Sequence, residues 1–243
     1  MQREILARIL DVPNSTPYMG ILMETGIWTM EARLAYKKLM LYHNILHSDE
    51  ERIIKKILQI QEEEERSGTW NDGVQKMVDY YGIEKDVNEV LKSEWKKEVK
   101  EKIRNKVAEE VKEKCHGMKK TRSIKNDKFE MKEYFEQTTL AEATDIIRTR
   151  LHMTKLTCNY GGVVNEQCPL CGVTGSIQTE HYIGRCKMTA TLTKIWETSS
   201  EDLQSSNLEH QRRVKDHLKK VEILMETHMK KILDKSRADQ MEN

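Results

Sequence analysis

The 243-residue sequence is poor in the residues and runs that build β-rich or membrane-spanning proteins. It has 11 glycines and 3 prolines, too few for a turn-dense β-sandwich. No run of about 18 apolar residues occurs, so no membrane contact is expected. The charged start, MQREILARIL, lacks the apolar core of a signal peptide. These absences predict a helical protein in an intracellular, reducing compartment, the nucleus or the cytoplasm.

Motifs for catalysis are also missing. No two aspartates are adjacent, which excludes the usual carboxylate pair of a two-metal polymerase from this sequence. There is no glycine-rich phosphate loop and no Gly-x-Ser-x-Gly motif. Glu-x-Lys pairs occur at 94–96 and 98–100, in a stretch so charged that chance accounts for them. We therefore expect no enzymatic activity from this chain.

Charge of one sign is not in excess over the whole chain. Lys and Arg number 41 and Asp and Glu number 40, so any nucleic-acid surface must arise from local segregation of charge. Residues 92–125 show such segregation, with thirteen basic and six acidic residues. Two interpretations carry equal weight: a nucleic-acid-binding surface, or a solvated helix face with i,i+4 ion pairs.

Apolar residues recur at helical spacing along most of the chain. Residues 30–47 place Leu34, Leu41 and Ile45 on one stripe, which Leu39 and Leu46 widen and which we expect to face a helical bundle. Residues 86–115 carry an apolar residue at every fourth position, and such a stripe drifts around the helix. Thr29 and Thr139 are candidate N-caps, and Gly82 is a candidate C-cap.

This periodicity predicts a mainly α protein: an elongated helical bundle, a small zinc-stabilised module and a C-terminal amphipathic helix. We expect three regions, which are a helical region at 1–150, the module at 151–190 and a helical tail at 191–243. The last helix, 207–236, has apolar residues close to a and d positions and is a candidate surface for a partner helix or a second copy.

One pattern predicts a metal site. Cys168 and Cys171 are separated by two residues and followed by Gly172, and His181 and Cys186 come shortly after. Three thiolates and one imidazole form a closed tetrahedral site, the structural kind of zinc site. The alternative is a set of free buried thiols with a surface histidine. Of the two cysteines outside this pattern, Cys158 is interpreted as a core or free thiol.

Basic and aromatic residues accompany the cysteine pattern. Charge and stacking together suit single-stranded RNA or DNA. The alternative is that the two arginines before the pattern pair with acids of the helical body and only anchor the module. The candidate nucleic-acid-binding residues are Arg148, Arg150, Lys155, Tyr182, Arg185 and Lys187.

Three stretches resemble the C-terminal part of non-LTR retrotransposon reverse transcriptases. TPYMGILMETGIWTMEARLAYKKLMLYHNIL (16–46) resembles the segment after the polymerase palm. IIRTRLHMTKLTCNYGG (146–162) resembles the Arg-Thr-Arg helix and the Asn-Tyr that follows it. CPLCGVTGSIQTEHYIGRC (168–186) resembles the Cys-Cys-His-Cys knuckle, including its Thr-Glu-His run. The three motifs occur in the family's order.

The resemblance implies thumb or connector helices followed by a zinc knuckle, a region that helps to hold template RNA or target DNA. It carries over to Cys168, Cys171, His181 and Cys186 as metal ligands, and it makes Arg148 and Arg150 nucleic-acid or domain-docking residues. The palm with its Asp pair is missing, so we do not expect reverse transcription by this chain alone. The leading hypothesis is therefore a non-catalytic nucleic-acid-binding region, and the alternative is a zinc-stabilised helical interaction or dimerisation module.

Overall fold

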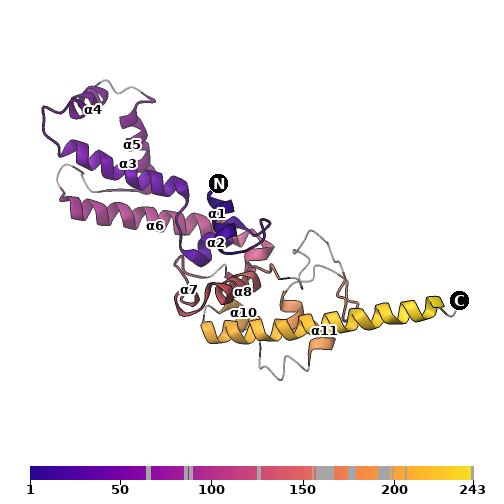
Figure 1. Cartoon of the computed structure of the whole chain (residues 1–243). Coiled ribbons are helices and arrows are strands. Elements are labelled where there is room, and N and C mark those ends of the chain that lie inside the picture. Colours follow the sequence, from indigo (N-terminus) through magenta and orange to yellow (C-terminus); the bar gives the residue numbers. More distant parts are fainter. Residues whose placement is uncertain are drawn as a thin grey trace. The chain divides into compact units, whose positions relative to one another are not determined.

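The computed structural model describes most of the chain as α-helix (Figure 1). Within the described residues the only β-structure is two isolated bridges, Thr25–Met131 and Gln167–Thr174. None of the described helices combines the length and the apolar content needed to cross a bilayer. The mainly α prediction is therefore confirmed. The described residues are 1–63, 67–84, 87, 90–124, 127–154, 156, 167–174, 179–190, 198, 200–205 and 207–241.

The chain forms two compact units. The helical unit is Trp28–Glu110, and the knuckle unit combines Met1–Ile27 with Val111–Asn243. These divisions differ from the boundaries that we predicted at residues 150 and 190. The physical reason is that the last helix packs both on α8 and on the cysteine-rich segment, through two apolar clusters.

The helical unit contains α3 (Met30–Leu46), α4 (Ile53–Glu63), α5 (Trp70–Tyr81) and most of α6 (Lys92–His116). Its helix ends follow the expected chemistry. The hydroxyl of Thr29 accepts a hydrogen bond from the N–H of Ala32 at 3.2 Å, and Gly82 ends α5 with φ +61°. Both caps were predicted, whereas α6 begins at Lys92 rather than near residue 86.

The stripe of apolar residues at every fourth position is buried on α6 as predicted, and it anchors the helical unit. Trp95, Val99 and Ile103 are 1%, 0% and 0% exposed. The indole N–H of Trp95 also donates to the carbonyl of Leu39 on α3, at 3.1 Å.

The predicted stripe on α3 is buried only in part. Leu39 and Ile45 are buried as expected, whereas Leu34 and Leu41 are 59% and 50% exposed. The core face of α3 is completed by Ala32, Ala35 and Tyr42. Two alanines on this face let a neighbouring helix approach closely, so the contact does not need the larger leucines.

The knuckle unit is built from short helices and one long one. They are α1 (Gln2–Ile9), α2 (Tyr18–Thr25), η1 (Lys119–Ile124), α7 (Tyr134–Gln137), α8 (Leu140–Arg150), η2 (His181–Arg185), η3 (Lys187–Thr189), α10 (Ser200–Gln204) and α11 (Leu208–Met241). The hydroxyl of Thr139 caps α8 by accepting from the N–H of Glu142 at 3.3 Å, as expected. The predicted last helix at 207–236 corresponds to α11.

The helix α2 was not anticipated, and its end depends on Gly26. This residue has φ +62°, a left-handed conformation, and it ends α2. A Cβ placed on it would lie 2.5 Å from the backbone N of Met131 and 2.7 Å from the carbonyl C of Glu130. A side chain here would therefore meet main chain that cannot rotate away.

We predict that Gly26→Ala destabilises the knuckle unit by about 2 kcal/mol or more, the left-handed strain plus the backbone clash. Gly82→Ala is the matched control, because Gly82 has φ +61° but no atom within 4 Å of its Cβ position. The control should cost about 1 kcal/mol. Urea unfolding of the two variants measures both costs, each on the transition of its own unit. Equal losses would contradict the clash.

Candidate metal centre

The four predicted ligands converge. The sulfur atoms of Cys168, Cys171 and Cys186 and a ring nitrogen of His181 all lie within 4.8 Å of one another. The Cys171 Sγ and the His181 Nε2 are 3.4 Å apart. A tetrahedral ion with metal–sulfur and metal–nitrogen bonds of about 2.3 and 2.0 Å requires about 3.5 Å between those two atoms. The arrangement therefore fits one metal ion, and the four residues could hold it.

A tight turn brings the first two ligands together. The N–H of Gly172 donates to the carbonyl of Cys168 at 2.9 Å, and the N–H of Cys168 donates to the carbonyl of Val173 at 2.8 Å. Gly172 has φ +72°, which a residue with a side chain rarely adopts. The predicted role of this glycine is confirmed by its geometry.

A single helical turn presents the other two ligands. His181 begins η2, and the N–H of Cys186 donates to the carbonyl of His181 at 2.7 Å, closing the turn. Burial and the charge of Arg185 lower the pKa of His181, which keeps its imidazole neutral at pH 7. Neutral imidazole is the form that binds a metal.

Burial has the opposite consequence for one of the three thiols, that of Cys186. It raises the pKa of Cys186 to about 11, so this thiol stays protonated at pH 7 when no cation is near. A metal ion would stabilise the thiolate and release the proton. Metal binding and proton release are therefore coupled at this site.

The knuckle rests on the last two helices. Leu170, Tyr182 and Ile183 pack in one apolar cluster with Leu203 of α10 and residues of α11. The ring of His217, on α11, contacts the carbonyl of Tyr182 at 3.0 Å and the hydroxyl of Thr198 at 3.2 Å. The α11 members of the cluster are Val214, Leu218 and Val221.

This packing bears on the predicted partner surface at 207–236. The first part of its apolar stripe, Val214, Leu218 and Val221, is at most 3% exposed inside the knuckle unit. That part of the stripe supports the fold of its own chain. Association through the rest of the helix stays a prediction.

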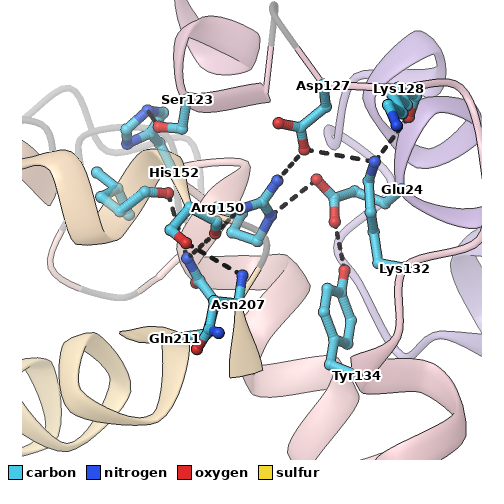
Figure 2. Close-up of polar contacts among 12 residues, drawn as sticks. Glu24, Ser123, Asp127, Lys128, Lys132, Tyr134, Arg150, His152, Asn207 and Gln211 are labelled. Atoms are coloured by element: carbon cyan, nitrogen blue, oxygen red, sulfur yellow. Dashed lines mark hydrogen bonds and ion pairs between the residues drawn. The ribbon is translucent and has the colours of Figure 1, made fainter. Parts of the chain in front are cut away.

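The structure corrects our interpretation of Arg150 as a nucleic-acid contact. Its side chain is 0% exposed, and its Nε donates to Glu24 Oε1 at 2.9 Å (Figure 2). Its two remaining guanidinium nitrogens donate to the Asp127 carboxylate and to the carbonyl of Ser205. Arginine binds two carboxylates here because a buried guanidinium needs compensating charge. This is the alternative considered from the sequence, in which the arginine pairs with acids and anchors the module.

Further polar groups complete the cluster around Arg150. The hydroxyl of Tyr134 donates to the other oxygen of Glu24, and Lys132 lies 3.6 Å from Asp127 (Figure 2). Burial raises the pKa of Asp127, although Arg150 and Lys132 both face its carboxylate. The cluster links α2, α7, α8 and the segment before α11.

Tyr182 is corrected for a similar reason. It is 1% exposed, and its ring lies edge-on to that of His181, with centroids 5.2 Å apart. The phenol is part of the core between the knuckle and α11, so no ring face is open for a nucleic-acid base.

The remaining candidates divide by exposure. Arg185 and Lys187 are exposed, and no described acid forms an ion pair with them. Arg148 is 27% exposed and donates to the carboxylate of Asp11 at 2.9 Å and, through its Nε, to the carbonyl of the same residue at 3.0 Å. Lys155 and Cys158 lie outside the described residues.

We predict that Arg150→Met destabilises the knuckle unit by about 3–5 kcal/mol, because it leaves Glu24 and Asp127 buried without a counter-charge. Arg148→Met, two residues away on the same helix, removes a partly exposed ion pair and the hydrogen bonds to the carbonyl of Asp11, and should cost about 1–2 kcal/mol. Urea unfolding of the metal-loaded protein compares the two variants. Similar losses would contradict the assignment of Arg150 as the anchor.

We also predict that Cys171→Ser abolishes metal retention, whereas Cys115→Ser preserves it. Cys115 is a buried cysteine of the same unit that takes no part in the cluster. Elemental analysis should find about one equivalent of metal in the wild type and in the control. Hydrogen exchange should accelerate over residues 167–189 in the Cys171 variant alone. Metal bound equally by both variants would refute the cluster.

The described geometry thus defines a closed Cys₃His centre supported by α10 and α11. Comparison with models of protein families, with curated proteins and with solved structures returns no match to this chain. The function must be inferred from the chemistry of the residues themselves.

Proposed function

We propose that the chain is a non-catalytic nucleic-acid-binding protein with a structural zinc ion, similar in role to the C-terminal region of a non-LTR retrotransposon reverse transcriptase. Support for this role comes from the three sequence motifs in family order, from the converging knuckle ligands and from a row of cations on α6. The observation that carries nucleic-acid binding is the row of cations.

Zinc is the proposed metal because of the ligand chemistry. Thiolate ligands favour zinc, copper(I) or iron–sulfur clusters, and three thiolates with one imidazole in a tetrahedron are typical of structural zinc sites. Four protein ligands leave no position for a reactive water, so the ion would stabilise the fold without catalysing hydrolysis. Ligation needs reduced cysteines, which agrees with a reducing compartment such as the nucleus or cytoplasm.

The cation row consists of residues that directly follow the positions of the apolar stripe on α6. Four of them, at successive positions i+4, are basic: Lys92, Lys96, Lys100 and Arg104. All four are exposed, and no described carboxylate forms an ion pair with them. Consecutive members are about 6 Å apart along the helix axis, so the row extends for about 18 Å.

Two other basic residues of α6 behave differently. Lys102 pairs with Glu84 at 3.0 Å, and Lys106 lies 3.6 Å from Glu109. The ion pairs of α6 therefore involve basic residues outside the row and leave the row positive. This separation favours the nucleic-acid interpretation over a uniformly paired helix face. Regularly spaced cations of this kind suit a phosphodiester backbone and carry no base specificity.

The knuckle supplies a second, smaller contact. Arg185 and Lys187 flank the last ligand and are exposed, so an ordered knuckle would present both cations to solvent. Arginine binds phosphate with two parallel hydrogen bonds. The burial of Tyr182 removes the predicted stacking contact, so we expect binding of single-stranded RNA or DNA that depends mainly on charge.

We predict that the full chain binds a labelled single-stranded RNA with an affinity that falls steeply between about 50 and 200 mM salt. Lys96→Gln/Lys100→Gln/Arg104→Gln should reduce the magnitude of the log–log salt slope by about 2, since each phosphate contact on a single strand contributes about 0.7. Fluorescence anisotropy measures the slope, and a single-stranded DNA of the same sequence tests the choice of nucleic acid.

The matched control is Arg33→Gln/Lys37→Gln/Lys76→Gln, which removes the same charge from exposed positions on α3 and α5 of the same unit. It should leave the salt slope unchanged. Arg185→Gln/Lys187→Gln tests the knuckle contact separately. Negligible binding at low salt would refute the proposed function, and equal effects of the two triple variants would refute the cation row.

A further inference from the structure

The helix α4 exposes an apolar ridge that its own unit does not cover. Ile53, Ile57 and Ile60 are 75%, 45% and 52% exposed. The buried contact of this helix is Leu58, which is 3% exposed and points to a different side. Isolated exposed aliphatic residues are ordinary, but three on one helix face, at spacings of four and three, are characteristic of a helix-packing seam.

The ridge continues into a groove between α3 and α4. The groove has a volume of about 160 Å³, and its walls include Leu41, Ile54, Ile57 and Trp70. Leu41 and Ile54 are each 50% exposed. Ile57 belongs to both the ridge and the groove, so the two form one continuous apolar surface.

The area of this surface matches a protein interface. About half of each of five large aliphatic side chains is exposed, which amounts to on the order of 500 Å² and lies near the upper end for a monomer. A standard interface covers about 800 Å² on each partner. The apolar fraction of the area buried on each copy would then be close to the roughly 65% that is typical of homodimers.

The charges beside the ridge indicate which partner fits. Lys56 and Glu63 lie seven residues apart, so they occupy the same flank of α4, with Lys56 beside the middle of the ridge and Glu63 just past its last residue. A two-fold axis that crosses α4 between Ile57 and Ile60 brings this flank against itself in the reverse direction and packs Ile57 of one copy on Ile60 of the other. Lys56 of one copy then meets Glu63 of the other, twice. In a parallel pair this flank would instead meet the flank that carries Ile54 and Gln61, which are uncharged.

Both charged residues are available for such a contact. Glu63 is exposed and forms no ion pair with any described residue. Lys56 lies 2.8 Å from Glu51, and the two side chains are 51% and 86% exposed. An ion pair this exposed contributes little to stability, so Lys56 can exchange its partner at low cost.

We propose that α4 is a self-association surface through which two copies of the chain pack antiparallel, with Ile57 of each copy against Ile60 of the other and Lys56 of each copy beside Glu63 of the other. The contact is isologous, as in most homodimers. It does not depend on nucleic-acid binding, and it uses a surface in the helical unit rather than the last helix.

The test is the mass of the full, metal-loaded chain, freed of nucleic acid, by sedimentation up to about 100 μM protein. The wild type should reach twice its 28.6 kDa mass as concentration rises. Ile57→Lys should leave a monomer with unchanged circular dichroism, because the side chain is already solvent-exposed. Leu91→Gln, which changes a residue that is 71% exposed elsewhere in the unit, should still dimerise.

Charge exchange tests the antiparallel arrangement. Lys56→Glu and Glu63→Lys should each weaken the dimer by about tenfold or more, since each places like charges together twice. The double exchange Lys56→Glu/Glu63→Lys should restore the dimer. A wild type that stays monomeric, a dimer that survives Ile57→Lys, or a double exchange that fails to restore it would overturn the proposal.

Discussion

The convergence of three sulfurs and one imidazole nitrogen within 4.8 Å is the constraint on which the C-terminal part of the structure depends. The segment between Gln167 and Thr189 contains few apolar residues, and three of them, Leu170, Tyr182 and Ile183, pack onto α10 and α11. A metal ion at the centre would hold the turn at Gly172 to the turn at His181 and so present one apolar surface to α11. Without it, the buried Cys186 thiol stays protonated and makes only weak contacts there.

A second constraint is the buried charge of Arg150. One guanidinium joins α8 to α2 through Glu24 and to the segment before α7 through Asp127. Clusters of this kind are costly to bury and strongly destabilising to break. Neighbouring basic residues therefore have different roles. Arg150 anchors the unit, and only the basic residues that remain at the surface can contact a charged ligand.

Local rules allowed much of the structure to be predicted from the sequence. Thr29, Thr139 and Gly82 sit at helix ends as expected, because a cap depends on only a few neighbouring residues. The metal ligands of the knuckle could also be predicted, since their spacing along the chain nearly determines their geometry. The stripe on α6 was identified because an apolar residue recurs at every fourth position along most of the helix.

Features that depend on distant parts of the chain could not be predicted in this way. Nothing local distinguishes Arg150 from Arg148, yet their partners, Glu24 and Asp11, place one in the core and the other at the surface. Leu34 and Leu41 of α3 and the isoleucines of α4 have the spacing of core residues. They are exposed because Leu39 on α3 and Leu58 on α4 make the intramolecular contacts instead.

The most direct measurement of the central claim is X-ray absorption spectroscopy at the zinc edge on the protein as purified from cells. The account predicts a single site with three sulfur ligands at about 2.3 Å and one nitrogen ligand at about 2.0 Å. Oxygen-rich coordination, a different ligand ratio or the absence of bound metal would contradict it.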